Sequence, residues 1–476
     1  MTSSFSGRKA SGARRSNRVR PGVEAVEPRA LPASGHPIVV AALGDSLTDE
    51  YSVLNPSTAA NASVVTSPFP LPVEFNTFGR DSARNWVEDL AANRPSQLTF
   101  GAYSTVNRGE VRNQGYAEDW ARTGTAASGP NLDGSGTTFA QEYRGSPGQS
   151  LPGLLTQTAA NSGYTPKDVN VVTIFIGTND YGRGLTEYTQ SLGHNDVFDG
   201  KKSGGPNPIN SQVEASIKTA VGQIRHAIPK AKIIIITPPA ITATPAVEAS
   251  LATDGSAFSG LSGKVSGSLK SLGDDLSRFA RQQKLGLVNS QAVEDQLRSA
   301  PTVDGVTVNL QGTGQDISDG FVNDGYHPGT IVQGRLAQAI VAKVDSMYGS
   351  KVISPLTDAE IVNYARAGQP TLALSVSAPT APTAGPRSVL GAVVTPGPGN
   401  TSVPTGSVTF GYPNPAEGTS GYLFTTIPLD GSGRATFTVP SASVDPGSIV
   451  AIYSGDQFNE ARNSRGATTA TSNPIG

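Results

Sequence analysis

The 476-residue chain contains no cysteine. Disulfide bonds, catalysis by a thiolate and cysteine-ligated zinc sites are therefore all excluded. The absence leaves the compartment open, because many exported bacterial proteins also lack cysteine.

Long hydrophobic runs are also missing. The chain has no run of about 18 apolar residues, which a membrane-spanning helix requires. Its N-terminal region lacks the apolar core of about 7–15 residues that a standard signal peptide contains. The sequence therefore predicts no transmembrane segment and shows no standard signal peptide.

A strong excess of charge is absent as well. The formal net charge of −2 argues against nucleic acid as the main partner. The distribution is uneven, because residues 1–35 hold seven basic residues against two acidic ones. This segment is also rich in Ser, Pro and Gly, so we predict a disordered basic tail over 1–35.

The length and composition of the chain indicate two globular domains. The chain is longer than one hydrophobic core usually organises, and its 54 glycines and 35 prolines indicate many turns and long loops. Short apolar runs predict buried strands at 38–43, 171–176, 233–236 and 285–288. Helical periodicity follows at 213–224, 261–279 and 332–344, and polar stretches at 49–110, 125–150, 181–210 and 238–258 are predicted as loops. The alternation favours an α/β domain over 36–350 with a parallel sheet.

The period of the pattern changes to two beyond about residue 368. Short strands are predicted at 371–377, 388–394, 406–411, 422–428, 434–439, 448–453 and 467–472, with turn signals between them. Seven short strands are typical of an antiparallel sandwich, which we place at 369–476. The segment 351–368 is predicted as a short linker helix.

Ser46 directly follows the first predicted strand, in the stretch 44–47 (GDSL). A serine there lies at the carboxyl edge of the sheet, where substrate can reach it. An unassisted hydroxyl is a poor nucleophile, so a base and an oxyanion site are needed. Taken alone, the tetrapeptide is equally consistent with a turn that caps the next helix.

Four histidines are candidates for the base, namely His36, His194, His226 and His327. The first lies in the tail, the second in a polar stretch and the third on a predicted helix. His327 lies in a Gly- and Pro-rich loop before the last predicted helix, three residues after Asp324. That carboxylate is close enough in sequence to orient the imidazole, so we predict His327 as base and Asp324 as its partner.

The oxyanion site needs hydrogen-bond donors. Asn179 follows the second predicted strand in the stretch 177–180 (GTND), at the same sheet edge as Ser46. Its side-chain amide can donate to a developing negative charge. By itself, the stretch is more typical of a simple turn.

Together these stretches resemble the SGNH (GDSL) hydrolase family. Residues 44–47, 177–180 and 324–327 (DGYH) look like blocks I, III and V, in the right order, and 121–126 (ARTGTA) looks like block II. The resemblance spans about residues 38–346 and implies a three-layer α/β/α fold. It also implies a serine ester hydrolase that needs no cofactor and no metal.

The resemblance assigns roles residue by residue. It implies Ser46 as nucleophile, His327 as general base and Asp324 as its orienting partner. It implies an oxyanion hole made by the Ser46 and Gly124 N–H groups and the Asn179 side chain. Gly115 is a competing candidate for the place of Gly124.

Several aromatic residues are candidates for the substrate pocket. Tyr181 and Tyr326 adjoin motif residues and could line the pocket or pack in the core with equal plausibility, whereas core packing is the commoner place for Trp86 and Trp120. Two DGSG stretches, at 133–136 and 430–433, lack the ligand spacing of an EF-hand and are predicted as turns.

The C-terminal segment resembles bacterial Ig-like repeats at 404–410, 433–437 and 452–458, and residues 23–31 resemble an LEPR-type segment of bacterial surface proteins. These resemblances imply a secreted or cell-surface location and contact with the surface or a polysaccharide through the Ig-like domain. The favoured hypothesis is an esterase acting on short-chain or carbohydrate acetyl esters. A lipase for longer acyl chains and an inactive adhesion protein with a relict SGNH domain are the alternatives.

Overall fold

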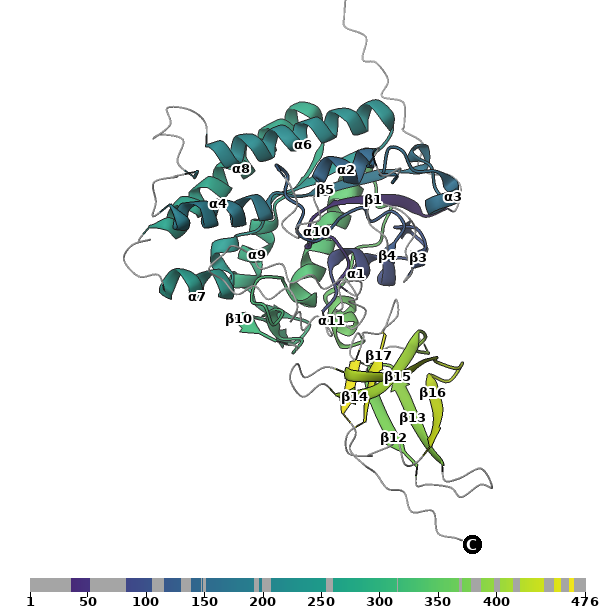
Figure 1. Cartoon of the computed structure of the whole chain (residues 1–476). Coiled ribbons are helices and arrows are strands. Elements are labelled where there is room, and N and C mark those ends of the chain that lie inside the picture. The colour runs from purple at the N-terminus through teal and green to yellow at the C-terminus, as the bar shows by residue number, and fades with distance from the viewer. Residues whose placement is uncertain are drawn as a thin grey trace, which may run out of the picture.

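A computed structural model shows how the chain folds (Figure 1). The residues it describes are 36–51, 83–104, 115–129, 138–146, 148, 151–191, 197–198, 207–253, 260–314, 316–367, 370–377, 387–397, 403–413, 420–440, 449–454 and 462–465. The predicted basic tail over 1–35 and the predicted strand at 467–472 lie outside these residues.

The α/β body is built on a five-stranded sheet in which all neighbouring strands are parallel. Its spatial order is β2-β1-β5-β6-β7. The strands are β1 (Ile38–Gly44), β2 (Leu98–Thr99), β5 (Val171–Phe175), β6 (Lys232–Ile236) and β7 (Gly286–Val288). The four predicted apolar runs are thus confirmed as strands of one sheet.

Helices cover both faces of this sheet. Alternate side chains of β1 point to opposite faces, so Ala41 and Leu43 join one core and Val40 and Ala42 the other. The first core is completed mainly by α6 (Pro208–Ala227) and α8 (Leu261–Gln283), and the second by α1 (Trp86–Asn93) and α10 (Thr330–Tyr348). The result is the expected three-layer α/β/α arrangement (Figure 1).

The strand order changes direction at β1. The chain adds β2 on one side of β1 and then continues with β5, β6 and β7 on the other. In open parallel sheets, the crevice at the carboxyl ends of the strands that flank such a point is the usual place for a ligand site. The carboxyl ends of β1 and β5 carry Ser46 and Asn179, respectively.

The stretches predicted as long loops contain helices, which corrects that expectation. They are α1, α2 (Phe139–Arg144), α4 (Thr178–Gln190) and α7 (Pro245–Thr253). Asn85 caps the N-terminus of α1 in a capping box. The Asn85 side chain accepts the Glu88 N–H, and the Glu88 side chain accepts the Asn85 N–H. In α1 and α2, buried polar side chains stand among the apolar ones and interrupt the apolar pattern.

Smaller elements complete the body. They are β3 (Tyr103–Ser104), β4 (Gly115–Tyr116), α3 (Ala159–Ser162), η5 (Pro166–Asp168), η6 (Ile241–Ala243), α9 (Ser290–Ser299), β8 (Thr302–Val303), β9 (Val306–Thr307), β10 (Asn309–Thr313) and β11 (Asp319–Phe321). Among the described residues, no helix is both long and apolar enough to cross a bilayer.

The predicted linker helix is present as α11 (Asp358–Ala367), but it packs into the α/β body. Ile361, Val362 and Ala365 share a small core with residues of α9 and α10. On the outside of α11, the Arg94 guanidinium donates to both carboxylate oxygens of Glu360, at 2.9 and 2.8 Å. This helix is therefore an integral part of the body.

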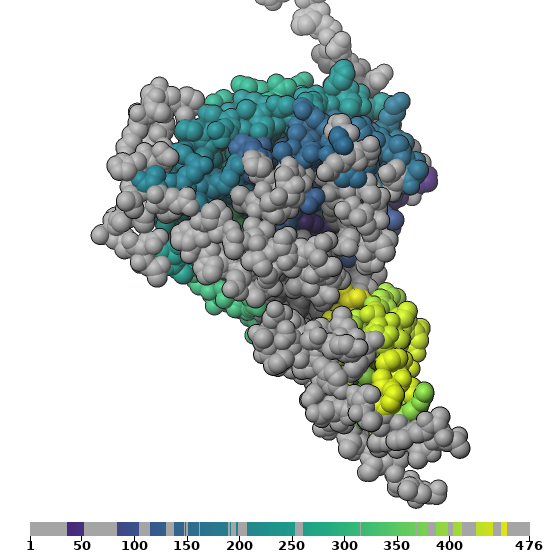
Figure 2. Space-filling model, viewed as in Figure 1, coloured from purple at the N-terminus to yellow at the C-terminus, as the bar shows by residue number. Residues whose placement is uncertain are grey.

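The C-terminal residues form two antiparallel sheets, so this domain is all-β as predicted. One sheet has the order β12-β13-β16 and the other β15-β14-β17-β18. The strands are β12 (Thr371–Val376), β13 (Arg387–Thr395), β14 (Ser407–Pro413), β15 (Ser420–Pro428), β16 (Arg434–Pro440), β17 (Val450–Tyr453) and β18 (Arg462–Arg465). Their inward side chains form a core of their own. Figure 2 shows the surface of this domain in green and yellow.

Candidate active site

Ser46 lies in a tight turn directly after β1. The N–H groups of Thr48 and Asp49 donate to the Asp45 carbonyl at 2.9 and 3.0 Å, which turns the chain at once. The Asp45 carboxylate accepts the Leu47 N–H at 3.1 Å and fixes the same turn from its side-chain end. The Ser46 side chain is held at the sheet edge and is 4% exposed.

Gly44 is needed because β5 passes very close to this turn. A Cβ atom at position 44 would lie 2.3 Å from the Phe175 carbonyl oxygen, a distance that real Cβ atoms do not adopt. The glycine of the GDSL stretch therefore permits the close pairing of β1 with β5 immediately before Ser46.

The structure brings Ser46, His327 and Asp324 into one hydrogen-bonded chain. The His327 Nε2 atom lies 2.6 Å from Ser46 Oγ, and Nδ1 lies 2.6 Å from Asp324 Oδ2. The other Asp324 oxygen accepts the backbone N–H groups of Tyr326 and His327, at 2.8 and 2.9 Å. The aspartate thus orients both the loop and the imidazole ring.

Two tyrosines confine the His327 ring. The Tyr326 ring stands edge-on to it with centroids 5.4 Å apart, and the Tyr51 ring does the same at 6.1 Å. The Tyr51 hydroxyl accepts a hydrogen bond from Gln333 at 2.9 Å, which fixes that ring in turn. His327 is fully buried, so the orientation of its ring is set by packing as well as by Asp324.

Gly124 lies in a turn that hydrogen bonds attach to β1. The Arg122 N–H donates to the Gly44 carbonyl at 3.1 Å, and the Thr125 N–H then donates to the Arg122 carbonyl at 3.1 Å. Gly124 occupies the third position of that turn with a φ of +80°, which favours glycine. Gly115 pairs with Ser104 in the β3–β4 hairpin instead, so the structure favours Gly124 for the predicted role.

Asn179 lies in the first turn of α4, next to the same segment. Its side-chain amide donates to the Thr125 carbonyl at 2.8 Å. A primary amide has two N–H donors, so this bond orients the group and leaves a second hydrogen for a substrate oxygen. Gly177, with a φ of +120°, allows the sharp change from β5 into α4.

Asp180 is a functional neighbour that sequence reasoning did not identify. Its carboxylate accepts the N–H groups of Ala127 and Ser128, at 2.7 and 2.9 Å, and pairs with Arg183 at 3.0 Å. It therefore ties the segment after Gly124 to α4. Asp180 directly follows Asn179 in the stretch 177–180, and this position is a sequence signal that points to Asp180.

The nucleophile turn also contains a buried acid. Burial raises the pKa of Asp45 to about 7, and the nearby Asp180 charge adds to this effect. The Leu47 N–H and the Thr178 hydroxyl act in the opposite direction. The Asp45 carboxyl therefore holds its proton more strongly than an exposed aspartate does.

The aromatic candidates divide between site and core. Tyr326 lies against His327, as its place in the motif suggested. Tyr181 is fully buried in the core, the second of the two places considered for it, and its hydroxyl donates to Asn210 at 2.5 Å and lies 3.3 Å from Ser268. Trp86 and Trp120 are core residues.

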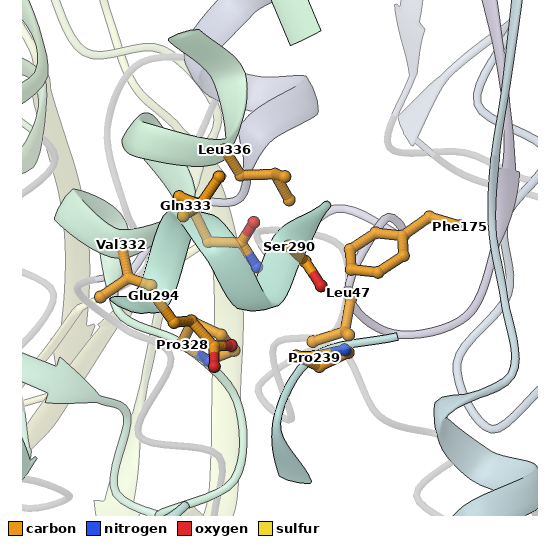
Figure 3. Close-up of a pocket in the computed structure, with 10 residues that line it drawn as sticks. Leu47, Phe175, Pro239, Ser290, Glu294, Pro328, Val332, Gln333 and Leu336 are labelled. Carbon is orange, nitrogen blue, oxygen red and sulfur yellow. The ribbon is translucent and has the colours of Figure 1, made fainter. Parts of the chain in front are cut away.

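An apolar pocket lies beneath the site, between the sheet edge and helices α9 and α10 (Figure 3). Leu47, which follows the nucleophile, and Pro328, which follows the base, both contribute to its wall. The other labelled lining residues are Phe175, Pro239, Ser290, Glu294, Val332, Gln333 and Leu336. Glu294 is its acidic group, and burial raises the pKa of that carboxyl to about 7.

Comparison with known families decides to which family the chain belongs. The profile described as GDSL-like Lipase/Acylhydrolase matches residues 40–340, which contain every residue placed in the site. The chain belongs to this family. The GDSL hydrolase is accordingly a carboxylester hydrolase, and no curated protein matches it.

Solved structures similar to this GDSL hydrolase include esterases and lipases. A mutant of Axe2, an acetylxylan esterase from Geobacillus stearothermophilus, shows 14% identity and a TM-score of 0.32 over 68% of this chain and 99% of its own. Phospholipase A1 from Streptomyces albidoflavus NA297 shows 15% identity and a TM-score of 0.32 over 64% and 99%. An extracellular lipase from Streptomyces rimosus shows 12% and 0.29 over 65% and 99%.

Proposed function

We propose that this hydrolase cleaves carboxylic esters through an acyl-enzyme intermediate on Ser46. The observation that carries the proposal is the continuous chain from Ser46 Oγ through the His327 ring to Asp324, with both contacts at 2.6 Å. A serine, an imidazole and a carboxylate in this geometry are the parts of a hydroxyl nucleophile activated by a general base.

The reaction runs in two halves. His327 takes the Ser46 proton as Oγ attacks the ester carbonyl, and the protonated ring then gives this proton to the departing alcohol. Water next attacks the acyl-serine with His327 again as base, which releases the carboxylic acid and restores Ser46. Asp324 keeps Nδ1 protonated throughout, so that Nε2 is free to accept.

Three donors stabilise the tetrahedral oxyanion in this proposal. They are the backbone N–H groups of Ser46 and Gly124 and the free amide hydrogen of Asn179. The hydrogen bonds that fix the turn of Gly124 to β1, and the bond from Asn179 to Thr125, support a preformed arrangement.

Short-chain and carbohydrate acetyl esters are the proposed substrate class. Ser46 is 4% exposed and His327 is fully buried, which favours a small acyl group beside the nucleophile. Longer acyl chains are the second candidate, because the apolar pocket beside Leu47 offers a surface that an alkyl chain could contact.

For the C-terminal domain we propose an Ig-like module and a location outside the cytoplasm. Its support is the pair of antiparallel sheets around their own core, together with the sequence stretches that resemble bacterial Ig-like repeats. Such a module would contact the cell surface or a polysaccharide.

Hydrolysis of p-nitrophenyl acetate tests the proposed chemistry. Ser46→Ala should abolish turnover, whereas Ser299→Ala, which changes an exposed serine of α9, should leave it unchanged. Acid-quenched wild-type protein should carry an acetyl group on the peptide that contains Ser46. Equal rates for wild type and Ser46→Ala would instead support the relict, non-catalytic alternative.

Substrate class is tested with the same variants. Rates on acetyl, butyryl and long-chain p-nitrophenyl esters, and acetate release from acetylated xylan, would rank the two candidates. A rate that increases with chain length would overturn the proposed preference for short acyl groups.

A further inference from the structure

A buried glutamate outside the four motifs contacts the strand that carries the nucleophile. Glu142, on α2, is fully buried, and its Oε2 atom accepts the Gly44 N–H at 2.9 Å. Gly44 is the last residue of β1, two positions before Ser46. An ionisable side chain with no exposed surface and a contact 98 residues away in sequence requires an explanation.

The place of this contact is unusual for a parallel strand. Beside β1, the Ala42 N–H donates to the Glu118 carbonyl, and the Trp120 and Arg122 N–H groups donate to the carbonyls of Ala42 and Gly44. Continued regularly, this ladder would give the Gly44 N–H a backbone acceptor. The glutamate takes that position, so a side chain replaces backbone at the carboxyl end of the strand.

The second oxygen of the same carboxyl faces the oxyanion segment. Glu142 Oε1 and the Thr125 hydroxyl are both buried, and neither has a hydrogen-bond partner of standard geometry among the described residues. They lie near enough for the hydroxyl to lower the pKa of Glu142, although burial dominates and raises that pKa well above its ordinary value. The Thr125 hydroxyl therefore lies beside the Glu142 carboxyl, where each group is available to the other.

Thr125 continues the connection to Asn179. Its carbonyl accepts the Asn179 amide at 2.8 Å, and its N–H closes the turn that contains Gly124. Through Gly44 and Thr125, the glutamate thus reaches the residues that present all three oxyanion donors.

We propose that Glu142 is a positioning residue that holds the Ser46, Gly124 and Asn179 donors in one arrangement. The inference rests on the proposed function, because it assigns these three donors to the oxyanion. Glu142 acts through Gly44 and Thr125, so its proposed contribution is to transition-state stabilisation. Loss of the side chain should lower kcat and leave KM nearly unchanged.

The test compares Glu142→Ala with Glu142→Gln, using p-nitrophenyl acetate. Glu142→Ala should lower kcat about 10- to 100-fold, below the loss typical of a removed donor, with KM within about two-fold. Glu142→Gln should restore most of the rate, because its amide oxygen accepts from Gly44 and its NH₂ donates to Thr125.

A matched control separates positioning from stability. Asp89 on α1 is also a buried carboxyl whose pKa burial raises to about 7, but it bonds to Asn93 and lies outside the site. Asp89→Ala should lower thermal stability and leave kcat unchanged in the folded protein. Equal losses of kcat in Glu142→Ala and Asp89→Ala would overturn the proposal.

Two further variants keep the test decisive. In an Asn179→Ala background, Glu142→Ala should cost clearly less than in wild type, because part of what it positions is already gone. A full, additive loss would contradict the link through Thr125. If Glu142→Ala does not fold, Thr125→Val tests the proposal instead, because it removes the Thr125 hydroxyl and keeps the carbonyl that binds Asn179. A kcat of Thr125→Val equal to that of wild type would then overturn the proposal.

These outcomes are separable from those of the catalytic proposal. Wild-type activity in Ser46→Ala would remove the acyl-enzyme mechanism itself. An inactive Ser46→Ala together with a fully active Glu142→Ala would remove the positioning role alone.

Discussion

In the proposed mechanism, Asn179 has two tasks that a single amide group can combine. One N–H holds the Thr125 carbonyl, and the other is available to the oxyanion. Asn179→Ala should therefore lower kcat by about 10²–10³ with a small change in KM. Asn179→Asp should lose at least as much, since it replaces a donor with an acceptor that carries negative charge.

Steady-state kinetics on p-nitrophenyl acetate measure both variants. Asn93→Ala, which removes an amide on α1 that bonds to Asp89, serves as the control and should keep wild-type kcat. An Asn179→Ala rate within about three-fold of wild type would remove this side chain from the oxyanion site.

Residue spacing predicted which side chains meet at the site but not which way every neighbour points. Ser46, His327 and Asp324 could be selected because each follows a strand or precedes a helix in a short, distinctive stretch. Tyr181 could not be placed, because the start of α4 was not predicted. Two residues apart on a helix, Asn179 and Tyr181 point in nearly opposite directions, so one faces the site and the other the core.

Glu142 was beyond prediction for a different reason. Its contact with Gly44 joins positions 98 residues apart, and α2 is six residues long. An isolated acidic residue in a polar stretch normally lies on the surface. Its burial depends on a long-range contact that no local pattern encodes.

At the scale of elements, α11 contradicts the simple picture of a linker. It buries Ile361, Val362 and Ala365 and anchors Arg94 through Glu360. A chain ending at residue 350, the predicted end of the hydrolase domain, should therefore be markedly less stable than one ending at residue 368. The shorter chain exposes the apolar surface of the body that α11 covers. This exposure costs roughly 25 cal/mol for each Å² uncovered.

Urea unfolding and esterase assays of the two truncations measure this difference. The chain ending at 368 should retain wild-type kcat, because the core of the C-terminal sheets is separate from those of the body. Equal stability of both truncations would show that α11 contributes nothing to the body. The exposed pair Lys270 and Asp274 supplies a control, since Lys270→Ala should change stability by less than about 0.5 kcal/mol.

The elements themselves were predictable in proportion to their apolar content. The buried strands and the long amphipathic helices were identified because continuous or periodic apolar residues mark them. The sequence pattern predicts loops where the helices α1, α2, α4 and α7 lie. Polar caps and buried acids such as Glu88, Asp89 and Glu142 interrupt their apolar pattern.

At the scale of the whole molecule, buried acids set the pH dependence of stability. Burial raises the pKa values of Asp45, Asp89 and Glu294 to about 7. Between about pH 4 and 7 the unfolded chain has lost these protons and the folded chain still holds them. Stability from these groups is therefore complete below about pH 4 and is lost as the pH rises to 7.

Glu360 acts in the opposite direction, since hydrogen bonds from Arg94 lower its pKa to about 2. Its contribution is present above about pH 4.5 and is lost as the pH falls towards 2. These four groups together place the largest free energy of unfolding near pH 4–5.

Urea unfolding at pH 5 and pH 8 tests this expectation, and the value at pH 5 should be larger. Asp89→Asn should reduce the difference by up to about 2.7 kcal/mol, because about two pKa units of the Asp89 shift lie between pH 5 and its folded-state pKa of about 7. A wild-type protein that is equally stable at both pH values would contradict it.

The confined His327 ring has a spectroscopic consequence. Its Nδ1–H points at Asp324 across 2.6 Å, with both side chains almost completely buried. A proton in such a short hydrogen bond, shielded from water, should exchange slowly with solvent. It should also resonate far downfield in a proton NMR spectrum. Only four histidines compete for the assignment, and Asp324→Asn should erase the signal. The resonance would report the state of the site without substrate, and its absence at low temperature would show that the ring is less firmly held than its packing implies.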